Sequence, residues 1–182
     1  MKIMLDAGHG PETPGKRTPD GKMREFEFNQ VVVQLMKMEL QKCGVIVLLS
    51  HLGTSDVPLI ERTTLANKLG VNAFISIHAN AFGSSWNDVS GIETFTYTKP
   101  SSHSKILSKL IQDSMCSTTK RTNRGVKRAN FAVLRDTKMP AVLVECGFMT
   151  NRAEAALLQS ASYRNLCSNA MAHAILSWNK KS

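Results

Sequence analysis

FISIHAN, residues 74–80, is an apolar run with the character of a buried strand, yet a histidine lies near its end. Two other stretches are built in the same way. KIMLDAGHG, residues 2–10, passes from a short apolar strand to His9, and AVLVECGF, residues 141–148, is an apolar run interrupted by Glu145. Three strands of the buried type therefore each carry an ionisable residue at or just past the carboxyl end.

Strand-like apolar runs alternate along the chain with stretches of helical spacing. The predicted strands are residues 2–5, 45–50, 73–77, 92–97, 131–134 and 141–144. Strands that alternate with helices form βαβ units, in which helices cover both faces of a parallel sheet. We therefore predict a single α/β domain over residues 1–182, with a mostly parallel, twisted sheet of about six strands and helices on both faces.

Residues 27–43 form one of the predicted helices. We predict that Val31, Leu35 and Met38 make up its apolar face and that Gly44 ends it. Three more segments have helical spacing, namely residues 56–70, 101–118 and 161–180.

Length and composition exclude several classes of protein. At 182 residues the chain is long enough to bury a core without disulfides. No segment approaches the roughly 20 apolar residues of a membrane span, and the apolar stretch at the N-terminus is too short for a signal peptide. We therefore expect synthesis in the cytoplasm. The cysteines lack metal-site spacing and are predicted to be buried free thiols, namely Cys43, Cys116, Cys146 and Cys167.

The formal net charge of +9 predicts an anionic partner or anionic surroundings. Much of this charge lies in KRTNRGVKR, residues 120–128, which we interpret as a solvated loop. This stretch lacks the aromatic residues on which single-stranded nucleic acid stacks. We therefore expect no nucleic-acid partner.

The ends of the predicted strands point to a metal site. In open α/β sheets, ligands bind at the carboxyl ends of the strands, so His9, His78 and Glu145 are expected to lie close together. Imidazole and carboxylate groups suit Zn²⁺, and a catalytic zinc ion usually has three protein ligands. Glu25 is a candidate for the third ligand, but its position at the start of a helix is equally well explained by the helix dipole. The sequence has no HExxH motif, which excludes a metalloprotease site built on one helix.

Several of these stretches also carry a resemblance to a known family. They are MLDAGHG, GKMREFEFN, LIERTTLANKLGVNAFISIHANA, GIETF and RGVKRANFAVLRDTKMPAVLVECGFMTN, in this order between residue 3 and about residue 151. In these motifs the chain resembles the catalytic domain of the zinc-dependent N-acetylmuramoyl-L-alanine amidases of bacterial autolysins and bacteriophage endolysins.

The resemblance implies roles for individual residues. It implies that one Zn²⁺ ion is bound by His9, Glu25 and His78, and that Glu145 is the catalytic glutamate. The implied reaction is hydrolysis of the amide bond between the lactyl group of N-acetylmuramic acid and the first L-alanine of the peptidoglycan stem peptide. Glu27 is an alternative to Glu25, but the four-residue step from Glu25 to Asn29 matches the family pattern.

Two polar residues inside the matched stretches are expected to have structural roles. We expect Arg62 to pair with a carboxylate such as Glu61 or Asp56 rather than to contact substrate. Asn80, which follows His78, is expected to fix its loop through hydrogen bonds between side chain and backbone.

The same resemblance predicts partners and a place of action. Peptidoglycan would be the substrate, anionic wall polymers would attract the basic surface, and the protein would be a monomer. It would act on the bacterial cell wall after release by a holin or by cell lysis, unless the chain is a trimmed catalytic domain. We expect the chain to carry no wall-binding module, since none is visible up to the closing SWNKKS. The alternatives are another zinc hydrolase, such as a carboxypeptidase, and a non-enzymatic binding protein.

Overall fold

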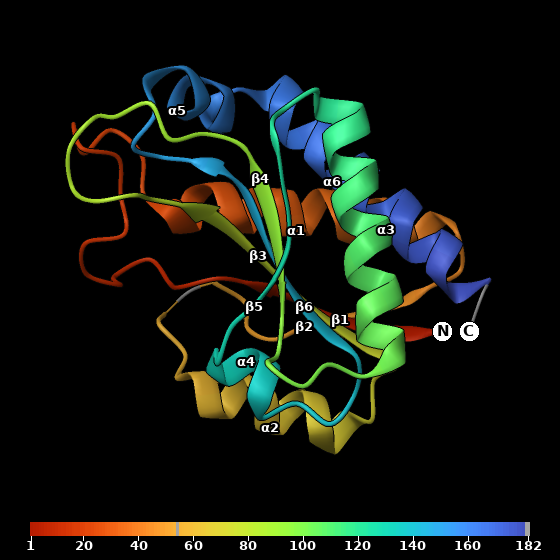
Figure 1. The fold of residues 1–182 in the computed structure, drawn as a ribbon. Helices are drawn as coiled ribbons and strands as arrows, with labels where there is room; N and C mark the ends of the chain where they lie inside the picture. The colour runs from red at the N-terminus through yellow and green to blue at the C-terminus, as the bar shows by residue number, and fades with distance from the viewer. Residues whose placement is uncertain (54, 181–182) are drawn as a thin grey trace.

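A computed structural model describes residues 1–53 and 55–180 and contains a six-stranded sheet between two layers of helices (Figure 1). The strands are β1 (Lys2–Ala7), β2 (Ile46–Leu49), β3 (Ala73–Asn80), β4 (Ile92–Thr96), β5 (Asn123–Arg128) and β6 (Ala141–Phe148). The helices are α1 (Glu25–Lys42), α2 (Leu59–Leu69), α3 (Ser102–Thr119), α4 (Ala132–Arg135), α5 (Arg152–Gln159) and α6 (Ala161–Asn179). The predicted fold class is confirmed.

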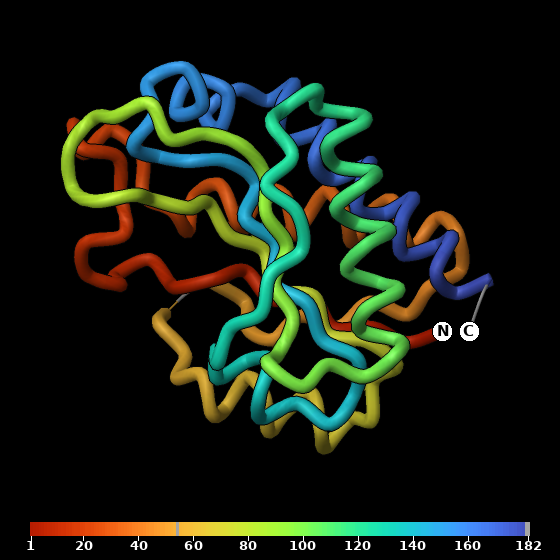
Figure 2. The backbone as a smooth tube through the Cα atoms, in the orientation of Figure 1, coloured from red at the N-terminus to blue at the C-terminus, as the bar shows by residue number. Residues whose placement is uncertain are grey.

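The strands follow the order β2-β1-β3-β6-β4-β5, and every neighbouring pair is parallel except β4 with β6. The central strands β1, β3 and β6 are nearly continuous apolar runs, as expected for strands that are covered on both faces. Their carboxyl ends point to one edge of the sheet. In Figure 2 the loop after β1 and the loop after β3 both project beyond that edge.

Helices α1, α3 and α6 cover one face of the sheet and enclose the larger core, whereas α2 and α4 cover the other face (Figure 1). Among the described residues, no helix is both long and apolar enough to cross a membrane. The two hydrophobic layers hold the sheet in place, so that its carboxyl edge is a fixed platform for side chains.

The buried face of α1 differs from the predicted one. Val31 and Met38 are 38% and 51% exposed, and Leu35 is only half-buried. The residues that pack against the sheet and α6 are Phe28, Val32, Val33, Met36 and Leu40. The run of three valines offers an apolar side chain in several directions, and contact with β1, β3 and α6 selects one of them.

The prediction of a strand at residues 131–134 was wrong. Most of these residues belong to the short helix α4, which buries Val133 and Leu134 against the second core. The strand is β5, in the basic stretch that we interpreted as a solvated loop, where Val126 pairs with Thr94 of β4. Edge strands commonly carry basic residues. A search for apolar runs in the sequence therefore does not detect β5.

Three smaller differences concern element ends and cysteines. Strands β3 and β6 continue past their predicted ends to Asn80 and Phe148, and helix α5 was not predicted. All four cysteines are free, as predicted, and Cys146 and Cys167 are buried. Cys43 is exposed, because it follows the last turn of α1, and Cys116 is half-buried.

Candidate metal centre and catalytic site

Three side chains from separate segments meet at the carboxyl edge of the sheet. His9 follows β1, Glu25 is the first residue of α1, and His78 lies near the end of β3. One ligand atom from each lies within 4.8 Å of the others. The structure thus brings together all three residues that were expected to bind metal.

Glu25 lies between the two histidines. Its Oε2 is 3.1 Å from Nε2 of His9, and its Oε1 is 2.8 Å from Nδ1 of His78. The two imidazole rings meet edge to face, with their centroids 5.0 Å apart. Burial by itself would raise the pKa of Glu25, but the hydrogen bonds to His78 and His9 outweigh it and hold that pKa well below its usual range. Glu25 is therefore a carboxylate in this site.

Glu27 does not share this position. Its side chain is exposed and accepts a hydrogen bond from the backbone N–H of Arg24, as in a capping box at the start of α1. Glu25 also lies in the first turn, so the expectation from the helix dipole holds for it as well. Burial and the contacts with the histidines distinguish Glu25 from Glu27.

The backbone around His9 is shaped to admit the second imidazole. His9 itself has a positive φ of 64°, and Arg62 Nη2 donates a hydrogen bond of 2.7 Å to the His9 carbonyl. A Cβ atom at Gly8 would lie 2.1 to 2.5 Å from three ring atoms of His78. Glycine is therefore required at position 8 for the His78 ring to occupy its place.

Arg62 is buried and pairs with a carboxylate, but not with either of those expected. Its Nη1 lies 3.0 Å from Asp6 Oδ1, and it also donates to the carbonyl of Ala7. Asp56 instead accepts hydrogen bonds from Glu12 and Thr13. The pairing with Glu61 or Asp56 was therefore wrong, because the side chain of Arg62 turns into the sheet edge.

Asn80 has the expected contact with its own loop, since its Oδ1 accepts a hydrogen bond of 2.8 Å from the N–H of Ala81. It also donates a bond of 2.7 Å to Glu93 on β4. Arg124 and Lys127 pair with the other oxygen of Glu93. The loop after β3 is thus tied to both strands at the far side of the sheet.

Glu145 lies on β6 directly beside His78 in the register of the sheet. Its Oε2 is buried and has no hydrogen-bond partner among the described residues. Burial raises the pKa of Glu145 to about 8, against the influence of a charged His78 and with a contribution from Glu25. A carboxyl with a pKa near neutrality can both accept and release a proton at physiological pH.

Glu145 and both histidines line a cleft of about 670 Å³. Its lining also includes a set of apolar residues, namely Val57, Pro58, Leu59, Phe131 and Val133. Lys16 lines this cleft and also an adjoining one of about 370 Å³, where Glu25 contributes to the wall. The cleft is large enough for a small ligand beside a metal.

The donor set fits a divalent zinc ion. Imidazole nitrogen and carboxylate oxygen are ordinary zinc ligands, and three protein ligands leave the open position that catalytic sites use. Nδ1 of His78 and Oε1 of Glu25 are hydrogen-bonded at 2.8 Å, so one ligand atom of each residue already points into the same small space. Although burial lowers the pKa of His78, its hydrogen bond to Glu25 raises it overall, as expected where a cation is favoured.

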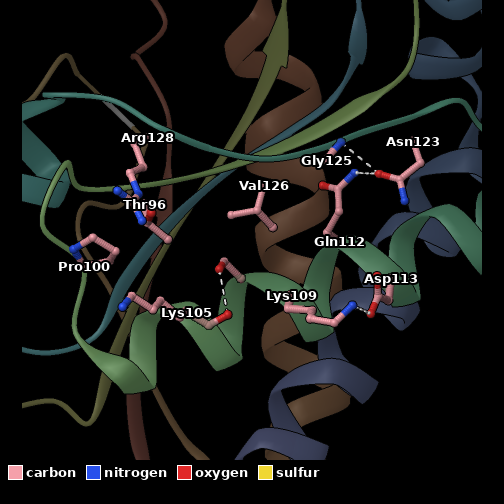
Figure 3. Close-up of a pocket in the computed structure, with 11 residues that line it drawn as sticks. Thr96, Pro100, Lys105, Lys109, Gln112, Asp113, Asn123, Gly125, Val126 and Arg128 are labelled. Atoms are coloured by element: carbon pink, nitrogen blue, oxygen red, sulfur yellow. Dashed lines mark hydrogen bonds and ion pairs between the residues drawn. The ribbon is translucent and has the colours of Figure 1, made fainter.

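A second cleft, of about 450 Å³, lies between α3 and the edge strand β5 (Figure 3). Lys105 and Arg128 project beside it, while Lys109 pairs with Asp113 at 2.8 Å (Figure 3). None of the three proposed metal ligands lines this cleft. Its lining includes the basic residues Lys105, Lys109 and Arg128 and the acidic residue Asp113.

Comparisons with known proteins point to one family. The family model for N-acetylmuramoyl-L-alanine amidase (Amidase_3) matches residues 3–177. N-acetylmuramoyl-L-alanine amidase LytC of Bacillus subtilis (strain 168) is 34% identical over 170 residues, covering 93% of this chain and 34% of that protein. The endolysin of Bacillus phage SPP1 is 33% identical over 168 residues, covering 90% of this chain and 60% of the endolysin.

A solved structure is similar over the whole chain. The crystal structure of N-acetylmuramoyl-L-alanine amidase from Clostridium difficile 630 superimposes with a TM-score of 0.95 at 29% identity, covering 100% of this chain and 97% of that one. By contrast, the chain spans only 34% and 60% of the length of the two relatives named above. Sequence, fold and the match over residues 3–177 lead to one conclusion: the chain belongs to the N-acetylmuramoyl-L-alanine amidase family.

Proposed function

We propose that this protein is a zinc-dependent N-acetylmuramoyl-L-alanine amidase that acts on the bacterial cell wall. It would hydrolyse the amide bond between the lactyl group of N-acetylmuramic acid and the L-alanine of the stem peptide. One observation carries this proposal: His9, Glu25 and His78 form a compact ligand set, and Glu145 lines the same cleft with a buried, unpaired oxygen.

His9, Glu25 and His78 would hold the metal, and the rest of the chain would hold these three in place. When bound, zinc supplies a Lewis acid that polarises the scissile carbonyl and makes water more acidic. The Gly8 backbone leaves room for the His78 ring, and Arg62 fixes the carbonyl of His9. The ligands are therefore in position before the metal arrives, which lowers the cost of binding it.

Glu145 would move the proton. Its carboxylate takes a proton from the attacking water and then gives it to the nitrogen of L-alanine, which leaves as an amine. An amide needs this second step, because an unprotonated amine anion is a very poor leaving group. Burial raises the pKa of Glu145 in the metal-free chain, and a bound zinc ion would oppose this rise, because a nearby positive charge favours the carboxylate that accepts the proton.

Digestion of purified peptidoglycan, with and without a metal chelator, tests the proposal. We expect new amino groups of L-alanine to appear, to vanish with chelator and to return with added Zn²⁺. Free carboxyl-terminal amino acids in place of L-alanine amino groups would indicate a carboxypeptidase instead. Turnover that persists after complete removal of metal would refute the zinc-dependent mechanism.

The variant Glu145→Gln separates metal binding from catalysis. Because Glu145 is not among the three ligands, we expect this variant to bind one equivalent of zinc and to lose turnover by at least about 100-fold, in the usual range for loss of a general acid–base. His78→Ala is the matched variant that should lose the metal itself. Glu145→Gln with nearly normal activity would remove Glu145 from the mechanism.

We further propose that the groove between α3 and β5 attracts anionic wall polymers. Lys105 and Arg128 line it, and the whole chain carries a net charge of +9. Positive charge of this size draws a polyanion to the surface and is screened by salt. The groove does not contain the metal ligands, so polymer binding there would leave the cleft open to substrate.

A further inference from the structure

A chain of buried hydrogen bonds runs from His78 to the neighbouring strand. Ser76 precedes His78 by two residues on β3 and therefore lies on the same face of the sheet. The Oγ of Ser76 is 3.1 Å from Nε2 of His78 and donates a hydrogen bond of 2.6 Å to Oδ2 of Asp6. Asp6 lies on β1, opposite Ser76 in the register, and both residues are at most 1% exposed.

Asp6 is held in its charged form by the groups around it. The Oδ1 atom accepts one hydrogen bond of 2.5 Å from Ser50 Oγ and one of 3.0 Å from the guanidinium of Arg62. The ion pair with Arg62 is itself buried. An ionised carboxylate has no hydrogen to give, so Asp6 can only accept.

Counting hydrogens then fixes the state of His78. Ser76 has a single hydroxyl hydrogen, and Asp6 takes it. Toward His78 the hydroxyl can therefore only accept, so Nε2 of His78 must carry a hydrogen. Without metal, Nδ1 of His78 and Oε1 of Glu25 share a hydrogen at 2.8 Å. That hydrogen is the one a metal would replace, and its loss frees the lone pair on Nδ1.

We propose that Asp6 and Ser76 are positioning residues that hold His78 in the Nε2–H tautomer, so that Nδ1 presents its lone pair to the metal. This inference rests on the proposed zinc site. Metal-binding histidines commonly donate their other N–H to a carboxylate or another acceptor, which fixes the ring and makes it a better ligand. Here the hydroxyl of Ser76 accepts the hydrogen bond from His78 and donates one to the carboxylate of Asp6 on the neighbouring strand.

Arg62 connects Asp6 to the second proposed histidine ligand, His9. One guanidinium nitrogen contacts Asp6, and the next donates to the carbonyl of His9. The buried ion pair therefore connects the support of His78 to the backbone that positions His9. A single cluster beneath the sheet edge holds both imidazoles.

The first test needs no variant. Two-bond ¹H–¹⁵N correlation spectra of the full chain, labelled with ¹⁵N-histidine and loaded with Zn²⁺, report which ring nitrogen of each histidine carries hydrogen. We expect His78 to be protonated at Nε2 and bound through Nδ1. Zinc bound with hydrogen on Nδ1 of His78 would overturn this inference alone, whereas a chain that binds no zinc would refute the proposed function.

The second test compares two serines that donate to the same carboxylate. Ser76→Ala removes the link to His78, and Ser50→Ala removes a buried donor to Asp6 whose hydroxyl makes no hydrogen bond to either proposed histidine ligand. In competition with a chelator, we expect Ser76→Ala to bind Zn²⁺ about 10- to 100-fold more weakly. Ser50→Ala should keep the affinity of the parent chain.

The melting temperature of each metal-free variant measures its loss of stability. Comparing this loss with the change in zinc affinity shows whether the weaker binding is explained by a less stable fold. Ser76→Thr keeps a hydroxyl and should restore much of the affinity. Unchanged affinity in Ser76→Ala, or an equal loss in Ser50→Ala, would overturn the proposal, since either result would remove the special role of the Ser76 contact.

Discussion

Gly8 determines whether two imidazoles can share one metal site. The chain passes between β1 and His9 so close to the His78 ring that a single Cβ atom at Gly8 would lie 2.1 Å from a ring carbon. Because His78 comes from β3 and cannot withdraw without leaving Glu25, the lack of a side chain at Gly8 is part of the site. The motif AGHG therefore supplies the proposed ligand His9 and also, through Gly8, the room that the His78 ring needs.

Replacing Gly8 by alanine should abolish zinc binding while the chain still folds. The added methyl group displaces the His78 ring, whereas the surrounding strands keep their hydrophobic packing. Zinc content after dialysis and far-ultraviolet circular dichroism measure the two effects. The control is Gly44→Ala, where φ is 76° and no atom lies near: it costs about 1 to 2 kcal/mol of stability, because alanine disfavours the left-handed conformation, but it should keep the metal. Normal zinc content in Gly8→Ala would contradict the steric argument.

Glu145 should make the stability of the metal-free protein depend on pH. Its pKa is about 8 in the folded chain and 4.5 in the reference state, so the folded chain holds a proton that the unfolded chain releases. Its contribution to stability is thus complete below pH 4.5 and is lost as the pH rises to about 8. Glutamine does not titrate and has no such loss.

We therefore expect Glu145→Gln to gain stability relative to the parent chain between pH 5 and pH 9, by roughly 1 to 4 kcal/mol. Urea unfolding at the two pH values, with chelator present, measures this difference. Comparison of the two proteins at each pH cancels the other groups that titrate in this range. A constant difference across the range would mean that the pKa of Glu145 is not raised.

At the scale of elements, helix α1 begins at Glu25 and holds this residue in position, because the buried face of the helix packs in the core. Glu25 keeps its place only if the helix does not rotate, and rotation is opposed by the side chains packed on the sheet and α6. Two methionines on the same helix make this testable, because Met36 is 0% exposed and Met38 is 51% exposed.

Met36→Ala should lower the free energy of unfolding by about 2 to 5 kcal/mol, since it leaves a cavity in the core. Met38→Ala should change it by less than about 0.5 kcal/mol, because the side chain lies largely in solvent. Both variants have the same chemical change and nearly the same helix propensity. Chemical denaturation measures the two values, and a larger loss in Met38→Ala than in Met36→Ala would favour the face first predicted from the sequence.

On the scale of the whole molecule, the net charge of +9 should govern attachment to the wall. We expect binding to teichoic-acid-bearing walls to fall by roughly tenfold or more between low and high salt, as for other electrostatically guided association. The double variant Lys105→Glu, Arg128→Glu changes the proposed groove. The control Lys42→Glu, Lys68→Glu changes the net charge equally at exposed positions of α1 and α2.

Cosedimentation with walls, before and after removal of the anionic polymers, separates the two possibilities. The groove variant should bind less than the control on complete walls and equally on stripped ones. Equal binding of the two variants to complete walls would show that overall charge, rather than the groove between α3 and β5, attracts the protein.

The sequence by itself determined the fold class and the residues that meet at the sheet edge. Alternating apolar strands and helical stretches predict a parallel sheet, and a parallel sheet gathers the ends of distant strands at one edge. For this reason His9, His78 and Glu145 could be placed together without coordinates. That inference needs only the direction of the strands, which local pattern encodes.

Only the tertiary structure decided which partners the remaining side chains take. Spacing could not choose between Glu25 as a ligand and as a helix-start residue, and it gave Arg62 neighbours in sequence instead of Asp6, 56 residues away. It also placed a strand at residues 131–134, where the edge strand is in fact β5. Such choices depend on contacts between segments far apart in the chain, and their energies are set by packing and burial that no local pattern contains.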